Sequence, residues 1–488
     1  MKRLARKILL FIIPSLAGAA VVLLAVAVYF LNKQPDLKVW HTASLDEEFS
    51  AESPIASFSQ YRALEARLFR ELDEEIYNRI GRNDRFPVNR YNRGSLSDPG
   101  RWQVNWNRSY ELPVERPRAG VLLLHGLSDA PYSLRSIGKR LHGARAWVVG
   151  LRLPGHGTAP AALTRATWRD MAAAVRLGMD HLRAKIGDKP IYMVGYSTGA
   201  TLAIHYSLEN LSGSGRPAAE RLVLISPAVG VTPAAALAVW QARLGHLLGL
   251  EKLEWHVVNP EYDPFKYKSF PINASNQIYR LTQVVQSRLD GLDETALRRF
   301  PSTLAFQSAT DATVMARDVI DKFFSRLPDG GHEVVMFDIN RSRTLEFLLA
   351  GDPGPWLQSL LAEDALPFSL SLLTSPEPDS QEIVVKYKPA GATAPETIPT
   401  RMRWPDDVYA ISHIALPISP RDPLYGTGEA SGATALQLGN LALRGERDVL
   451  RLSGTDMLRL SWNPFYDYVE ERILKFLHLQ EAAGPAGP

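Results

Sequence analysis

Between residues 121 and 337, short apolar runs alternate with longer segments in which apolar residues recur at helical spacing. The runs have no polar face, which is typical of strands buried on both faces of a parallel sheet. They occupy residues 121–124, 147–151, 191–194, 222–225, 303–306 and 333–337. Strands that alternate with helices predict an α/β fold, in which helices cover both faces of a mostly parallel sheet.

Composition and charge exclude several classes of protein. The 488 residues include 55 basic and 52 acidic ones, with a formal net charge of +3. This even balance gives no electrostatic reason to expect a nucleic-acid partner. The chain has no cysteine, so disulfides, thiolate nucleophiles and cysteine-based metal sites are excluded.

The N-terminus predicts a membrane anchor. Basic residues at positions 2, 3, 6 and 7 precede the apolar run 9–31, which as a helix would span about 34 Å, enough for a bilayer core. Basic residues ahead of the run predict a single-pass protein with the bulk of the chain on the extracytoplasmic, periplasmic side. The alternative is a signal peptide cleaved after the Ala25-Val26-Ala27 pattern, which would remove residues 1–27 and give a secreted protein.

A nucleophile motif follows one of the predicted strands. Gly195-Tyr196-Ser197-Thr198-Gly199 lies between the strand 191–194 and a segment of helix-forming residues. A serine on a tight strand-to-helix turn has an exposed hydroxyl, and the two glycines leave room for that turn. We interpret Ser197 as a nucleophile; the alternative is an ordinary turn serine.

A second loop supplies groups that can stabilise an oxyanion. His125-Gly126-Leu127 directly follows the strand 121–124. Glycine lets the backbone approach a substrate closely, so we assign the backbone N–H groups of Leu127 and Thr198 to an oxyanion hole. His125 itself is interpreted as structural, as is His156 in the turn after the next strand.

Four sequence blocks together resemble a known superfamily. LLLHGLSD, RLPGHG, GYSTGA and SATDATV are similar to blocks of the α/β-hydrolase superfamily, in its monoacylglycerol lipase, lysophospholipase and carboxylesterase branch, which is also described as serine aminopeptidase-like. The resemblance covers roughly residues 118–340 and 405–480. It implies an α/β-hydrolase fold and a Ser-His-Asp triad whose acid follows a late strand.

The resemblance implies that Asp311 is the catalytic acid. Asp311 lies in the block SATDATV, just after the predicted strand 303–306. A carboxylate there can accept the N–H of the catalytic histidine and hold its tautomer. Asp338 and Asp352 are the alternatives, in poorer sequence contexts.

Two histidines compete for the remaining role. His332 precedes the strand 333–337, whereas sites in parallel sheets lie at the carboxyl ends of strands. His413 lies in a loop that resembles the catalytic loop of the family, ahead of a predicted final helix at 464–479. We therefore choose His413, although it lies 102 positions after Asp311, whereas relatives usually place the two residues one short strand–loop unit apart.

The chain divides into eight predicted segments. The α/β-hydrolase core is interrupted by a helical, aromatic-rich cap and by a second insertion. The segments are the anchor or signal peptide 1–33, a linker with an amphipathic helix 34–100, core 101–230, cap 231–299, core 300–340, insertion 341–405, core 406–481 and a disordered tail 482–488.

These residues predict acyl transfer from an ester to water, with no metal or organic cofactor. The apolar cap and the predicted anchor favour a lipid-derived ester, such as a lysophospholipid, a monoacylglycerol or a short-chain carboxylester. Two alternatives stay open. One is a peptidase or amidase, because the same triad cleaves amides; the other is a non-catalytic binding protein with this fold.

Overall fold

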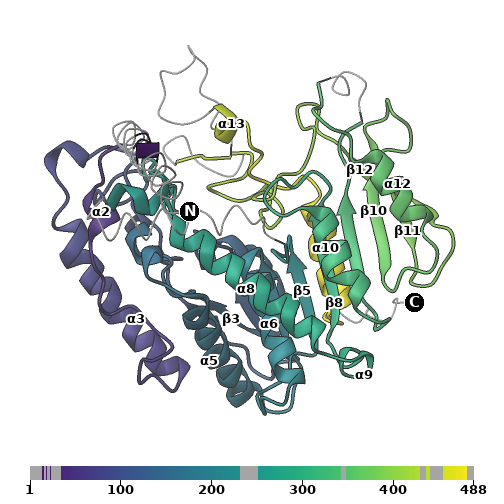
Figure 1. The fold of residues 1–488 in the computed structure, drawn as a ribbon, viewed down its shortest axis with the longest axis horizontal. Coiled ribbons are helices and arrows are strands. Elements are labelled where there is room, and N and C mark those ends of the chain that lie inside the picture. Colours follow the sequence, from purple (N-terminus) through teal and green to yellow (C-terminus); the bar gives the residue numbers. More distant parts are fainter. Residues whose placement is uncertain are drawn as a thin grey trace, which may run out of the picture.

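A ten-stranded sheet forms the centre of the protein (Figure 1). The computed structural model describes residues 35–230, 251–341, 348–428, 436–439 and 454–480, with Pro14, Ser15, Gly18 and Val22. The strands lie in the order β1-β3-β2-β4-β5-β8-β9-β10-β11-β12. Their bounds are β1 Tyr110–Leu112, β2 Ala119–Leu124, β3 Ala146–Leu151, β4 Ile191–Tyr196, β5 Arg221–Ile225, β8 Ser302–Ser308, β9 Glu333–Phe337, β10 Ser369–Thr374, β11 Glu382–Lys388 and β12 Glu396–Arg403.

The six apolar runs of the sequence form the parallel centre of this sheet. β3, β2, β4, β5, β8, β9 and β10 pair in parallel, and β1 pairs with β3 antiparallel. Successive side chains of a strand point to opposite faces. In β2, Leu122 and Leu124 belong to the hydrophobic core on one face, whereas Val121 and Leu123 belong to the core on the other. Both faces are covered, so these strands lack a polar side.

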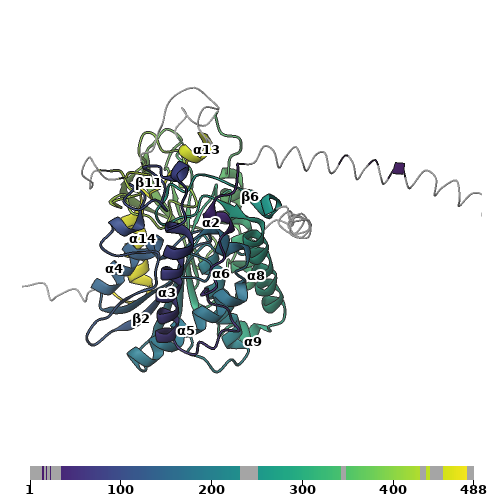
Figure 2. The same ribbon diagram turned by 90° about the vertical axis from the view of Figure 1, so that its left-hand side faces the viewer.

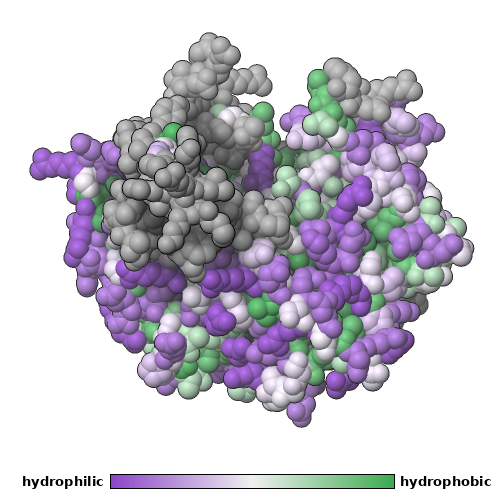
Figure 3. Space-filling model, viewed as in Figure 1, coloured by the Kyte–Doolittle hydropathy of each residue, from purple (hydrophilic) through white to green (hydrophobic). Residues whose placement is uncertain are grey.

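Helices cover both faces of the sheet, as the sequence predicts (Figure 2). The first layer contains α5 Trp168–Ile186, α6 Thr198–Leu211, α8 Ile272–Asp290, α10 Ala316–Lys322 and α12 Gly354–Ala362. The second contains α4 Arg135–Gly143 and α14 Tyr466–Phe476. Hydrophilic residues predominate on the outer side of the first layer (Figure 3). The shorter helices α2 Val39–Thr42, α9 Glu294–Leu297 and α13 Gly454–Met457 lie among the loops.

Residues 348–405 lengthen the sheet beyond β9. β10 pairs with β9 in parallel, and β11 and β12 then add antiparallel partners. This segment falls within the predicted insertion 341–405. β12 is an edge strand with mostly exposed side chains, and it carries Pro399 and several charged residues, which oppose edge-to-edge pairing.

The predicted cap is described only in part. Residues 231–250 lie outside the described residues. The remainder contains the antiparallel pair β6 Trp255–Val257 and β7 Phe270–Pro271, followed by α8, which packs along α6. The tail 482–488 also lies outside the described residues.

The prediction of a membrane-spanning helix is corrected. Within the described residues, no helix is long and apolar enough to cross a bilayer. The longest described helices, α5 and α8, have 19 residues each and carry charged residues between their buried ones. The predicted span 9–31 and the alternative signal peptide 1–27 lie outside the described residues except at four positions. An apolar run of sufficient length is necessary for a span but does not establish one, so the transmembrane helix, the signal anchor and the single-pass extracytoplasmic localisation are withdrawn.

A buried arginine joins the N-terminal part of the chain to the sheet. α3 Phe58–Leu72 buries Phe58, Tyr61, Leu64, Leu68 and Leu72, which is the helical spacing seen in the sequence. Arg152, after β3, is fully buried and donates to Glu65 of α3 from Nε at 2.8 Å. Its Nη2 donates to Glu48 at 2.9 Å and its Nη1 to the carbonyl of His156 at 3.0 Å. Burial raises the pKa of Glu65 although Arg152 opposes this, so the carboxylate depends on the arginine for its charge.

We expect Arg152→Ala to reduce the free energy of unfolding by about 3–5 kcal/mol, because it leaves two carboxylates without their buried partner. Arg421→Ala is the control. Arg421 forms an exposed ion pair with Asp467, whose loss costs about 0–1 kcal/mol. Urea denaturation of both variants measures the difference, and equal losses would contradict this role for Arg152.

Candidate active site

Ser197 lies at the turn between β4 and α6. Its backbone has φ +53° and ψ −116°, a strained conformation for a residue with a side chain. The surrounding structure holds it there, because its N–H donates to the carbonyl of Ile225 at 2.8 Å. Its carbonyl accepts from Ala200 at 3.0 Å and Thr201 at 3.2 Å. In the part of the chain that the structure describes, the Ser197 hydroxyl has no hydrogen-bond partner, His413 included.

Steric crowding explains the two glycines of the motif. A Cβ on Gly195 would lie 2.5 Å from the Cα of Ala200, and one on Gly199 would lie 2.1 Å from the carbonyl oxygen of Leu124. Both clashes are with backbone, which side-chain rotation cannot relieve. The turn that exposes Ser197 therefore requires glycine on each side.

The loop after β2 lies against the nucleophile turn. A Cβ on Gly126 would lie 3.3 Å from the Cβ of Ser197. The backbone N–H groups of Leu127 and Thr198 donate to no other described residue, so both are available to a ligand.

Both ring nitrogens of His125 bond to the backbone. Its Nδ1 donates to the carbonyl of Gly126 at 2.8 Å, and its Nε2 accepts from the N–H of Leu153 at 3.0 Å. Burial, followed by the nearby His156, lowers the pKa of His125 well below its usual value, so the ring is neutral. This agrees with the structural interpretation of His125.

Asp311 follows β8 and is oriented by its own loop. Oδ1 accepts from the N–H groups of Thr313 at 2.8 Å and Val314 at 2.9 Å. The other oxygen, Oδ2, is directed to His413. Burial raises the pKa of Asp311, but the hydrogen bonds from His413 and Ser226 and the charge of His413 outweigh it, so the net pKa lies below its ordinary value.

The structure brings His413 to Asp311. Nδ1 of His413 donates to Oδ2 of Asp311 at 2.8 Å. The ring packs on Tyr196, with centroids 5.2 Å apart, and the Tyr196 hydroxyl donates to the His413 carbonyl at 3.4 Å. Ser412, the preceding residue, donates to the Leu460 carbonyl at 2.6 Å. The loop is therefore fixed on both sides of the imidazole.

Ser226 is a site residue that sequence reasoning missed. It directly follows β5 with φ +48°, and its hydroxyl donates to Oδ2 of Asp311. The hydroxyl oxygen of Ser226 also lies 2.8 Å from Nδ1 of His413. Because its one proton goes to Asp311, Ser226 accepts part of the Nδ1–H bond. Its position after the predicted strand 222–225, at the carboxyl edge of the sheet, was the signal that could have found it.

The rival residues lie elsewhere. His332 precedes β9, and burial lowers its pKa to about 4. Asp338 accepts from Arg341 at 2.8 Å and from Thr374 at 2.6 Å. Asp352 also binds Arg341, at 3.0 Å. Neither carboxylate is hydrogen-bonded to His413.

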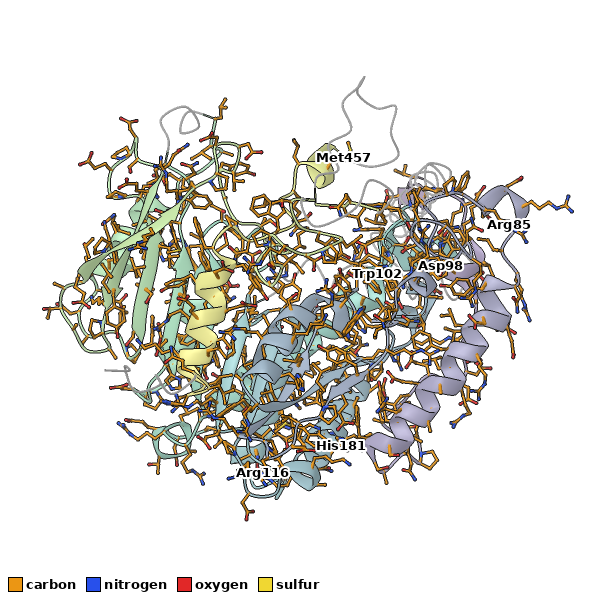
Figure 4. The ribbon with its side chains drawn as sticks, turned by 180° about the vertical axis from the view of Figure 1, so that it is seen from behind. Arg85, Asp98, Trp102, Arg116, His181 and Met457 are labelled. Atoms are coloured by element: carbon orange, nitrogen blue, oxygen red, sulfur yellow. The ribbon has the colours of Figure 1, made fainter. Side chains whose placement is uncertain are left out.

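A pocket of about 310 Å³ is lined by residues that neighbour the oxyanion loop and the histidine loop. Asp129, just after the oxyanion loop, and Ile414, next to His413, line it. Met457 of α13 belongs to its outer wall and lies at the upper edge of the molecule, above the carboxyl ends of the strands (Figure 4). Among the described residues, no cluster of three or more His, Asp or Glu side chains could hold a metal ion.

The fold is the α/β-hydrolase fold, and comparisons with known proteins agree with it. Residues 115–338 match the family described as "Serine aminopeptidase, S33", so this part of the chain is similar to the serine aminopeptidase-like branch of the α/β hydrolases. The match includes Ser197 and Asp311 and ends before His413. The resemblance seen in the sequence is thus confirmed.

Curated and solved relatives are lipases and esterases. A thermostable monoacylglycerol lipase of Bacillus sp. (strain H-257) is 28% identical over 177 residues, 36% of this chain and 67% of that protein. One solved chain, described with LipS and LipT, two metagenome-derived lipolytic enzymes, is 20% identical over 47% of this chain and 86% of that chain, with a TM-score of 0.36. The monoacylglycerol lipase of Paleococcus ferrophilus is 18% identical over 47% of this chain and 87% of that chain, with a TM-score of 0.35. The protein is a lipase- or esterase-like α/β hydrolase.

We expect Gly199→Ala to destabilise the protein by about 1–3 kcal/mol or more, because the added methyl meets the backbone of β2. Gly143→Ala is the matched control, since a Cβ there meets nothing within 4 Å. Thermal unfolding of both variants tests this. A Gly199→Ala protein as stable as the parent would show that the turn tolerates a side chain.

Proposed function

We propose that this protein hydrolyses carboxylic esters through an acyl-enzyme on Ser197, with His413 as general base and acid and Asp311 as its partner. The observation that carries the proposal is the hydrogen bond between Nδ1 of His413 and Oδ2 of Asp311. It leaves Nε2 of the imidazole as the basic nitrogen, which is what a general base needs. The strained backbone of Ser197, at the carboxyl edge of the same sheet, supports the assignment.

In this mechanism, Ser197 attacks the ester carbonyl while Nε2 of His413 takes its proton. The N–H groups of Leu127 and Thr198 stabilise the negative charge on the carbonyl oxygen. His413 then protonates the leaving alcohol. Water, activated by the same imidazole, attacks the acyl-enzyme, and the acid is released as Ser197 regains its proton.

The substrate class proposed is a lipid-derived ester: a lysophospholipid, a monoacylglycerol or a short-chain carboxylester. A monoacylglycerol lipase among the relatives supports this class. Apolar residues on one side of the pocket support it further, because Ile414, Ile418 and Leu438 can contact an acyl chain.

An aminopeptidase is the second candidate, because the family description favours it. Such an enzyme needs a free carboxylate to bind the substrate ammonium group. In the pocket, Asp263 is already paired with Lys268 at 2.9 Å, and Asp129 faces Lys266 at 4.0 Å. We therefore expect faster hydrolysis of 4-nitrophenyl butyrate than of alanine 4-nitroanilide, and the reverse order would favour the peptidase.

We expect Ser197→Ala, His413→Ala and Asp311→Asn each to lower kcat for 4-nitrophenyl butyrate by about 10⁴-fold. His332→Gln is the matched control, because His332 lies at the opposite end of its strand, and it should retain the activity of the parent. Circular dichroism verifies folding of each variant. A folded Ser197→Ala protein with the parent's kcat would contradict the proposal.

We expect Ser226→Ala to lower kcat by about 10-fold while KM changes little, because the variant loses hydrogen bonds to a charged pair that does not touch the substrate. Ser207→Ala is the control, since Ser207 is a buried serine of α6 that donates only to the carbonyl of Ala203. Steady-state kinetics on the same ester separates the two constants. An unchanged kcat would show that Ser226 does not position the imidazole.

A further inference from the structure

The pocket beside the candidate active site carries an excess of positive charge. Its wall includes Lys266, Lys268 and Arg459, against two carboxylates, Asp129 and Asp263. Lys268 pairs with Asp263 at 2.9 Å. Lys266 faces Asp129 only at 4.0 Å. In the described part of the chain, Arg459 pairs with no carboxylate.

Asp129 is a weak counter-charge for this pocket. Burial raises its pKa to about 6, although Lys266 opposes this. Its carboxylate therefore loses part of its negative charge in mildly acidic solution. Asp263 stays ionised, because Lys268 and the hydrogen bonds that its Oδ1 accepts from Tyr425 and the backbone hold its pKa below the ordinary value. Its charge is offset by Lys268 at 2.9 Å.

Hydrogen bonds link Arg459 and its neighbour in the chain to the loops that carry Asp311 and His413. Its Nη2 donates to Oγ1 of Thr313 at 3.1 Å, and the N–H of Thr313 donates to Asp311 at 2.8 Å. The next residue in the chain, Leu460, accepts the hydroxyl of Ser412, the neighbour of His413. Within the described residues, the guanidinium makes one hydrogen bond, and Arg459 is a half-buried residue that lines the pocket.

We propose that this pocket binds an anionic group of the ester, a carboxylate or a phosphate, with Arg459 as its main partner and Lys266 beside it. A guanidinium presents a planar fork of donors that matches either anion. A pocket that neighbours the oxyanion loop at Asp129 and the histidine loop at Ile414 can receive a group covalently attached to the reacting ester. The inference rests on the proposed esterase function and narrows its substrate class.

The test compares two matched pairs of esters on the full-length protein. 1-Decanoylglycerol and its 3-phosphate differ by an anion on the leaving alcohol. 4-Nitrophenyl butyrate and mono-4-nitrophenyl glutarate differ by an anion on the acyl side. For at least one pair, we expect the anionic ester to have the higher kcat/KM, and Arg459→Gln to reduce the anionic-to-neutral ratio by about 10-fold. The pair that responds shows which side carries the anion.

Two further variants separate recognition from a structural role. Arg459→Lys should recover part of the ratio because it restores the charge, whereas Arg401→Gln, which removes an exposed cation from β12, should leave the ratio at the parent's value. The proposal is overturned if both ratios are the same in the parent and in Arg459→Gln, or if the parent hydrolyses only the neutral esters. If the parent protein hydrolyses none of the four esters, the proposed esterase function itself is overturned.

Discussion

The hydrogen bond between His413 and Asp311 joins two loops that lie far apart in the chain. Asp311 follows β8, and the histidine lies 102 residues later. Between them the chain forms α10, β9, α12 and the three strands β10, β11 and β12, which extend the main sheet. The long segment still allows Asp311 and His413 to meet. The chain leaves the carboxyl edge of the sheet after β9 and returns to this edge before His413.

The return of the chain depends on specific polar contacts. Asn340, three residues after β9, donates from Nδ2 to the carbonyl of Val408 at 3.0 Å and from its N–H to that of Tyr409 at 2.8 Å. Asn463 donates to the carbonyl of Leu416 at 3.2 Å from the far side of the histidine loop. These hydrogen bonds hold the loop that carries His413, which is not part of a strand. They also link this loop to the end of β9, where the extension of the sheet begins.

His125 and His156, which lie in two of the sequence blocks shared with the superfamily, support the loop next to Ser197. The rings of His125 and His156 lie 5.0 Å apart, and His125 joins the oxyanion loop to the backbone at Leu153. Arg152 in turn binds the carbonyl of His156 and the carboxylates near the N-terminus. Burial lowers the pKa of both imidazoles, so they act as neutral hydrogen-bonding groups. The loop that would hold an oxyanion is thus supported by the packing of α3 on the domain.

Sequence reasoning succeeded where one local pattern determines the outcome. Buried parallel strands need apolar residues on both faces, so runs such as 191–194 were predictable. The turn around Ser197 was predictable because the clashes at Gly195 and Gly199 require glycine at both positions, which gives a recognisable sequence motif. Ser226 was not predictable by that route, because its role arises only when β5 and β8 become neighbours in the sheet. The extension by β10 to β12 depends likewise on long-range pairing. The apolar N-terminal run was over-interpreted, since hydropathy alone does not establish a span.

Labelling with a fluorophosphonate probe, followed by mass-spectrometric mapping of the modified peptide, tests the central claim most directly. The reagent reacts with a serine that a neighbouring base activates. The account predicts a single modified residue, Ser197, with labelling abolished in Ser197→Ala, strongly slowed in His413→Ala and unchanged in His332→Gln. Modification of another serine, or labelling that persists in a folded Ser197→Ala protein, would contradict it.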